Sequence, residues 1–235
     1  MQLSKRLSSV ASMVTAGYCL ADVGTDHGYV PIYLYERKLI PHAIAMDINK
    51  GPLERARLHI AESGMSQGIE TRLSDGLQNL KPGEADSVVI AGMGGPLIVK
   101  ILSAYPEVTA SLKELILQPQ SEIAQVRRWL YDNQYEITEE HLVFEEGKYY
   151  PMFRAVKCNA ANVPDALELK FGSLAVLKEK EILKEFLERE ISAKKVIVSR
   201  LMQEATEKSA QRAKEIEELI EQYKEMLARV AATIL

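Results

Sequence analysis

Three aspartates that each follow a predicted buried strand are the residues of this sequence best suited to holding a ligand. Asp22 ends the first strand, and Asp47 and Asp75 end the second and third. Gly24 and Gly28 follow the first strand in the segment LADVGTDHGYVPIYL, where they let a ligand approach the backbone at the start of a helix. Ligands of open α/β sheets bind beyond the carboxyl ends of the strands, so these residues predict one site.

The spacing of the same residues distinguishes between two ligands that contain a ribose. Asp47 lies 23 residues after Gly24, where a carboxylate can accept hydrogen bonds from both ribose hydroxyls. Asp75, beside Gly76, can accept a hydrogen bond from the amino group of an adenine. NAD needs a G-x-G-x-x-G turn around its pyrophosphate, but the glycines here are spaced G-x-x-x-G. Asp22 and Asp26 would repel a pyrophosphate and attract the sulfonium and ammonium groups of S-adenosylmethionine. The pattern favours S-adenosylmethionine, with S-adenosylhomocysteine as its product.

Strands and helices that alternate over about 140 residues are expected to position this site. Apolar runs predict strands at 18–24, 42–48, 68–76, 85–92 and 112–119, and helical spacing predicts helices at 3–14, 30–38, 51–64, 95–105 and 121–134. We expect Gly17 to end the first helix and Ser121 to cap the last. A hairpin is predicted over 135–158, with its turn at Glu146-Gly147-Lys148. The expected fold class is α/β, with a mostly parallel, doubly wound sheet whose last strand is antiparallel.

A second unit follows a change in composition at 159–164. From 173 to 235 the chain contains neither Gly nor Pro, and apolar residues recur at three- and four-residue steps. This pattern predicts two helices packed as an antiparallel, coiled-coil-like hairpin with its turn near ATEKSAQ, 205–211. We therefore expect a cofactor-binding catalytic domain over 1–160 and a helical hairpin over 161–235.

Composition restricts the partners and the compartment. The 235 residues carry a net charge of −4, so a nucleic acid would have to bind a local basic patch. No apolar run approaches the ~18 residues of a membrane span. Cys19 and Cys158 lack metal or redox spacing, and the four histidines are scattered, so we expect reduced thiols, a cytoplasmic location and no metal.

Five segments together resemble the bacterial tRNA (adenine-22-N1)-methyltransferases. They are DVGTDHGYVPIYL, AMDINKGPLERA, RLSDGL, VVIAGMGG and LILQPQSE. The resemblance covers the whole chain and implies a class I, Rossmann-like S-adenosylmethionine-dependent enzyme with a C-terminal helical hairpin. It also implies a tRNA substrate and formation of N1-methyladenosine at position 22.

The expected cofactor-binding residues lie at the strand ends and in the loops that follow. They are Asp22, Gly24, Thr25, His27, Gly28, Asp47, Ile48, Asp75, Gly76, Ala91, Gly92 and Met93. Methylases of exocyclic amino groups carry a Pro-Pro-aromatic loop after the fourth strand, and this chain has AGMGGP instead, which argues against N6 methylation. Because adenine N1 has an in-plane lone pair, alignment of the reacting atoms can provide most of the catalysis.

The expected catalytic residues are Asp26, Tyr29, Gly92 and Met93. A carboxylate at Asp26 would stabilise the cationic product base, although capping of the next helix is the alternative role. Tyr29 could stack or hydrogen-bond near the donor, or belong to the core. Gln118 and Gln120 could read a base edge, or stabilise their loop.

Candidate RNA contacts are the basic residues that cluster in the sequence. They are Lys5, Arg6, Arg127, Arg128, Lys194, Lys195 and Arg200. The alternatives to a tRNA methyltransferase are a methylase of a small molecule or protein, with the hairpin as a dimerisation device, and a tRNA-binding protein with a vestigial methylase fold. NAD-dependent reduction is a weaker alternative, and we expect a monomer because an antiparallel hairpin buries its own seam.

Overall fold

The computed structural model describes residues 1–159, 162–204 and 206–234. It divides into two compact units, Met1–Val163 and Pro164–Leu235. The domain boundary predicted between 160 and 161 lies outside the described residues, as does Ala205 in the predicted hairpin turn.

The first unit is built on a seven-stranded sheet with the order β3-β2-β1-β4-β5-β7-β6. Its strands are β1 (Leu20–Val23), β2 (Ala43–Asp47), β3 (Ile69–Leu73), β4 (Ser87–Met93), β5 (Glu114–Pro119), β6 (Tyr135–Glu145) and β7 (Lys148–Lys157). β1 to β5 pair in parallel, and β7 pairs antiparallel with both β5 and β6. This arrangement confirms the predicted mostly parallel sheet with an antiparallel last strand.

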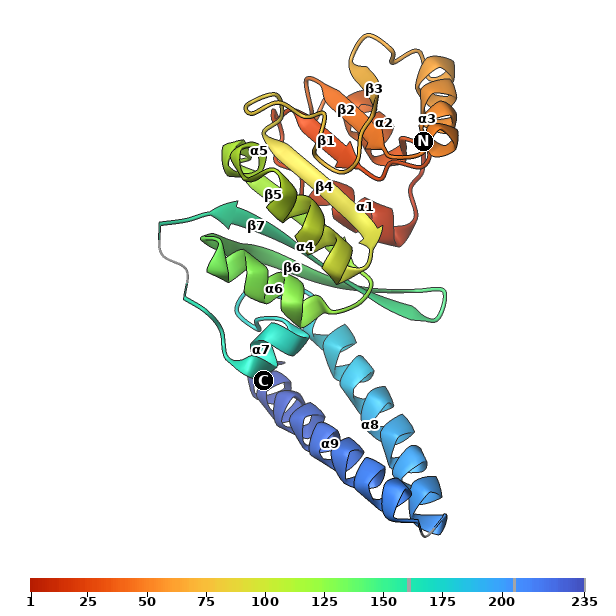
Figure 1. Ribbon diagram of the computed structural model, residues 1–235, viewed down its shortest axis with the longest axis vertical. Helices are drawn as coiled ribbons and strands as arrows, with labels where there is room; N and C mark the ends of the chain where they lie inside the picture. The colour runs from red at the N-terminus through yellow and green to blue at the C-terminus, as the bar shows by residue number, and fades with distance from the viewer. Residues whose placement is uncertain (160–161, 205, 235) are drawn as a thin grey trace. The chain divides into compact units, whose positions relative to one another are not determined.

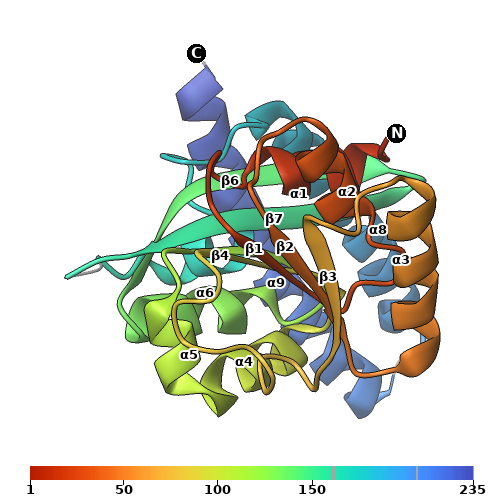
Figure 2. The same ribbon diagram turned by 90° about the horizontal axis from the view of Figure 1, so that it is seen from above.

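Helices cover both faces of the sheet (Figure 2). α1 (Lys5–Ser12), α2 (Tyr29–Glu36) and α3 (Lys50–Glu62) lie on one face, and α4 (Gly95–Ala104), α5 (Pro106–Ser111) and α6 (Ile123–Asp132) lie on the other. A strand between two helical layers is buried on both sides, which explains why every residue of β1 and β2 is buried. The strand order reverses direction at β1, because β2 pairs on one side of it and β4 on the other. The carboxyl end of β1 is therefore a topological switch point, where a ligand is expected.

Helix α1 ends earlier than predicted. This helix ends at Ser12, and Gly17 lies in the turn that follows, at a φ of 87°. There the N–H of Gly17 donates to the carbonyl of Leu39 at 2.7 Å. Gly17 therefore serves the turn into β1 and does not terminate the helix.

The start of α6 also differs from prediction. The helix begins at Ile123, and Glu122 occupies the N-cap position with a left-handed φ of 48°. Ser121 provides no cap, and its carbonyl instead accepts the N–H of Gly95, which joins the start of α4 to the end of β5. The short α5 was not predicted, because its six residues continue from α4 across Pro106 without a loop that separates them.

The second unit contains α7 (Ala166–Phe171), α8 (Lys180–Gln203) and α9 (Glu207–Ile234), with α8 packed against α9 (Figure 1). α8 begins at Lys180, seven residues later than the apolar spacing from Ser173 indicated. Its buried residues are Leu183, Leu187 and Ile191, which recur every four positions and form one stripe along the helix. Over the described ranges, every helix is too short or too polar to span a bilayer.

Candidate functional site

A pocket of about 340 Å³ lies at the carboxyl ends of β1 and β4. Its lining residues come from α1, β1, the loop that enters α2, the first turn of α2, strand β4 and the residue that follows β5. They are Arg6, Leu7, Asp22, Val23, Gly24, Thr25, Asp26, His27, Gly28, Tyr29, Val30, Val89, Ala91, Gly92 and Gln120. The pocket thus brings the loop at 24–28 next to Ala91 and Gly92 at the end of β4.

The loop at 24–28 needs glycine at both ends. Gly24 has a φ of 79°, and a Cβ at this position would lie 2.1 Å from Cε of Met93. Gly28 has a φ of 69° and stands at the N-cap of α2. The N–H groups of Gly24 and Thr25 donate to the carbonyl of Met46 at 2.8 and 2.9 Å, which ties the loop to β2. Backbone hydrogen bonds therefore hold the start of this loop against β2.

Asp22 is the buried acid of this pocket. Its removal from water, opposed by the Thr25 side chain and assisted by the negative charge of Asp47, raises the pKa of this carboxyl group to about 6. The two carboxylates therefore make this end of the sheet a place where positive charge is stabilised.

Asp47 and Asp75 lie at neighbouring strand ends, outside the lining of the pocket. Asp47 is buried, and its Oδ1 accepts the N–H of Asn49 at 2.7 Å, while its carbonyl accepts the N–H of Ser74. Asp75 is exposed in the turn after β3, beside buried Gly76, and Ile48 is exposed directly after Asp47. These residues extend the site along the sheet edge from β1 toward β3.

The chemistry of these residues fits the cationic donor favoured by the sequence. A ring nitrogen of His27, Nδ1, is buried and has no hydrogen-bond partner in the parts of the chain that are described. A buried polar atom of this kind costs free energy unless a bound group satisfies it. The pocket therefore combines an unsatisfied polar atom with a buried acid, as a polar and positively charged ligand requires.

Asp26 and His27 line the pocket and contact two residues of α3, Arg55 and His59, that sequence reasoning did not select. Oδ1 of Asp26 accepts hydrogen bonds from Nε of Arg55, at 3.1 Å, and from Nη2. Oδ2 of Asp26 lies 3.3 Å from Nε2 of His27. The rings of His27, Tyr29 and His59 are nearly parallel, with centroids 4.9 to 5.6 Å apart.

The opposite wall is formed by the turn after β4 and by Arg6 of α1. Nη1 of Arg6 donates to Oε1 of buried Gln118 at 3.0 Å. A Cβ at Gly92, whose φ is 81°, would lie 3.8 Å from Nε2 of Gln120 and 3.9 Å from Nη1 of Arg6. Gly92 therefore faces two hydrogen-bond donors, while Met93 packs beneath Gly24.

The basic residues predicted to contact RNA have different environments. Lys5, Arg128, Lys195 and Arg200 are exposed. Arg127 is 2 % exposed and forms a buried ion pair with Glu140 at 2.8 Å, so it is not placed to contact RNA. Lys194 is half-buried between Glu190 and the ring of Tyr223. Arg127 and Lys194 therefore take part in packing, and the sequence pattern could not distinguish this role from an exposed one.

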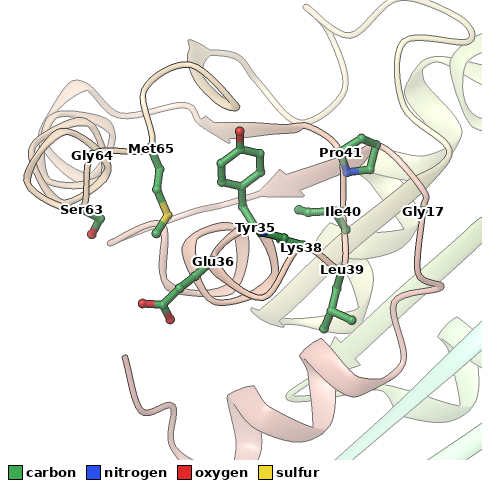
Figure 3. A pocket seen from close by; sticks show the side chains of 10 residues that line it. All are labelled: Gly17, Tyr35, Glu36, Lys38, Leu39, Ile40, Pro41, Ser63, Gly64 and Met65. Atoms are coloured by element: carbon green, nitrogen blue, oxygen red, sulfur yellow. The ribbon is translucent and has the colours of Figure 1, made fainter.

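A second pocket, of about 640 Å³, lies near the amino ends of β1, β2 and β3 (Figure 3). It is lined by Gly17, Tyr35, Glu36, Lys38, Leu39, Ile40, Pro41, Ser63, Gly64 and Met65. Glu36 is the acidic residue of this lining, and it already pairs with the amino group of Met1 at 3.1 Å. The smaller pocket is the better candidate site, because it contains the buried carboxyl group of Asp22 at the carboxyl end of β1, with buried Asp47 at the end of the neighbouring strand.

Comparisons with known proteins give consistent results. The family model described as "Methyltransferase domain" matches residues 3–153. A tRNA (adenine(22)-N(1))-methyltransferase of Bacillus subtilis is 36% identical over 97% of this chain and 98% of its own length.

Two solved structures share the whole architecture. M. capricolum TrmK with S-adenosyl-homocysteine has a TM-score of 0.85 at 27% identity, and covers 98% of this chain and 100% of its own. A Streptococcus pneumoniae protein in complex with S-adenosyl-L-methionine has a TM-score of 0.82 at 30% identity, over 96% of this chain and 100% of its own.

Proposed function

The chain belongs to the family of tRNA (adenine(22)-N(1))-methyltransferases, and we propose that it transfers the methyl group of S-adenosylmethionine to N1 of adenine 22 in tRNA. This activity agrees with the family resemblance and with the preference for S-adenosylmethionine over NAD that the spacing of the glycines and aspartates predicts. The observation that carries the proposal is the buried acidic pocket at the end of β1, in a chain that matches a methyltransferase of known substrate over almost its full length.

The donor is proposed to bind along the edge formed by β1, β2 and β3. In this arrangement Asp22 faces the cationic groups of the donor, and the loop from Gly24 to Gly28 lies against its methionine part. Asp47 accepts hydrogen bonds from the ribose hydroxyls. Ile48, Asp75 and Gly76 hold the adenine, and Ala91 closes the pocket from β4. When bound, S-adenosylmethionine would supply an electrophilic methyl group on a sulfonium. The nitrogen lone pair would attack the methyl carbon in line with the C–S bond, which breaks as S-adenosylhomocysteine leaves.

The acceptor adenine is proposed to enter between Asp26 and the turn after β4. Gly92 and Met93 provide a wall without a bulky side chain in the slot, so a flat base can approach the methyl group. The lone pair of N1 lies in the plane of the base, so no residue has to remove a proton before transfer. Asp26 then stabilises the positive charge that develops on the base, and Tyr29 stacks beside it.

A paired adenine does not expose N1, so the target base must be unpaired or rotated out of its helix. We propose that Lys5, Arg6, Arg128, Lys195 and Arg200 contact tRNA phosphates, with 1–160 as the catalytic domain and the hairpin of 161–235 as a tRNA-contacting appendage. The chain is further proposed to act as a monomer in the cytoplasm, where its tRNA substrate is found.

The test is transfer of labelled methyl from S-adenosylmethionine to an unmodified tRNA transcript, with a second transcript that carries guanine at position 22. We expect N1-methyladenosine in the first transcript and none in the second. Asp47→Ala should remove donor binding and activity, while Asp132→Asn, at an exposed position at the end of α6, should change neither. Donor binding without transfer to any tRNA would instead indicate a small-molecule or protein methylase.

A further inference from the structure

Helix α3 presents two side chains from one face to the loop at 24–28. Arg55 and His59 lie four residues apart, which places them one above the other on the helix. Arg55 donates two hydrogen bonds to Oδ1 of Asp26. Nδ1 of His59 lies 3.2 Å from the carbonyl oxygen of His27, and its ring stacks on those of His27 and Tyr29.

The ion pair between Arg55 and Asp26 contributes little to folding. The two side chains are 48% and 58% exposed, and ion pairs between exposed side chains contribute little to the stability of a fold. The main structural effect of this ion pair is to orient the carboxylate of Asp26. Because both donors engage Oδ1, the carboxylate is fixed with Oδ2 beside Nε2 of His27, in the lining of the pocket.

The same helix offers a matched comparison. Arg57 forms an ion pair with Glu54 through the same two donor atoms, and both side chains are likewise exposed. Neither residue lines the pocket. The Arg57–Glu54 pair lies within α3, whereas the Arg55–Asp26 pair joins α3 to the loop that lines the pocket.

We propose that Arg55 is a positioning residue for methyl transfer: it holds Asp26 in the rotamer that faces the acceptor base, with His59 supporting the same loop from the next turn of α3. The inference rests on the proposed role of Asp26. Arg55 touches neither donor nor base in this scheme and acts entirely through the carboxylate. Because misplacement of a catalytic group by about 1 Å can slow a reaction about 100-fold, loss of Arg55 is expected to affect kcat rather than binding.

The experiment compares Arg55→Gln, Arg55→Lys, Asp26→Asn, Arg57→Gln and the double variant Asp26→Asn/Arg55→Gln. For Arg55→Gln we expect kcat to fall by about 10- to 100-fold, with the Kd of S-adenosylmethionine and the KM for tRNA within about twofold of wild type. Arg55→Lys should restore part of the rate because it keeps one charged donor. Arg57→Gln should match wild type, and Tm should change by no more than about 3 °C in either arginine variant.

The double variant decides whether Arg55 acts through Asp26. We expect it to be no slower than Asp26→Asn, because a positioning residue has no effect once the group it positions is gone. Multiplicative losses would overturn the inference, as would wild-type kcat in Arg55→Gln. A raised KM with a weaker salt dependence would also overturn it, and would make Arg55 a phosphate contact. If Asp26→Asn itself retains full activity, the proposed role of Asp26 fails, which is a result separate from failure of the Arg55 inference alone.

Discussion

Asp22 is a buried carboxyl group whose ionisation opposes folding, and Asp22→Asn tests this directly. Burial raises its pKa from 3.8 to about 6. A shift of about 2 units corresponds to about 3 kcal/mol. Because the pKa of this acid is higher in the folded than in the unfolded state, the cost is absent below about pH 4. It then grows as the pH rises and is complete above about pH 6, where the folded protein also ionises.

Without donor, Asp22→Asn should be more stable than wild type by up to about 3 kcal/mol at pH 7.5, and by only about 1 kcal/mol at pH 4.5. Denaturant unfolding at the two pH values measures the difference. The same variant should bind S-adenosylmethionine much more weakly, so added donor should stabilise wild type and leave the variant nearly unchanged.

Asp86 provides a control of opposite sign. Its pKa is lowered by a hydrogen bond from Lys113, with the N–H of Cys19 acting in the same direction. Asp86→Asn should therefore lose stability at pH 7.5, where Asp22→Asn gains it. The reasoning about Asp22 is refuted if Asp22→Asn is less stable than wild type at pH 7.5, or if its gain is equal at both pH values.

Three further results are expected. Gly24→Ala should lower Tm and weaken donor binding, because its φ of 79° is strained for alanine and the added Cβ would displace the end of the Met93 side chain; thermal unfolding and calorimetry measure both. Arg127→Leu should destabilise by about 3–5 kcal/mol in denaturant unfolding, because it leaves Glu140 buried without its guanidinium, and should not change the salt dependence of tRNA binding. Lys195→Gln and Arg200→Gln should each reduce the slope of log Kd against log salt by about 0.7–0.9 in tRNA filter binding if they contact phosphates.

The parts of the fold that the sequence predicted are those in which local pattern and burial agree. β1, β2 and β4 are short apolar runs covered on both faces, and each is followed by a glycine or an acid at the strand end. The ends of α1 and α6 were predicted less well. Gly17 and Ser121 have the residue types of helix caps, but tertiary hydrogen bonds to Leu39 and Gly95 use their backbone groups elsewhere.

The candidate site also has a part that local pattern predicts and a part that depends on tertiary contacts. Its proposed donor side consists of residues that directly follow strands, so their convergence follows from the topology of the sheet. The proposed acceptor side depends on contacts between distant segments, such as Arg6 with Gln118 and Arg55 with Asp26. Nothing in the local sequence distinguishes Arg55 from Arg57, or buried Arg127 from exposed Arg128, because these differences arise only when helices pack.

The raised pKa of Asp22 also connects stability with donor binding. A cationic ligand favours the ionised carboxylate, so binding must release a proton whenever the pH lies below about 6. The affinity for S-adenosylmethionine should then fall as the pH decreases through 6, by up to about tenfold per unit, while Asp22→Asn should show no such dependence. Calorimetry in two buffers of different ionisation enthalpy measures the released proton. A fractional proton at pH 6 that disappears at pH 8 is expected, because the free carboxyl is already ionised there. Equal proton release at both pH values would mean that another group accounts for the linkage and that Asp22 does not face the positive charge of the donor.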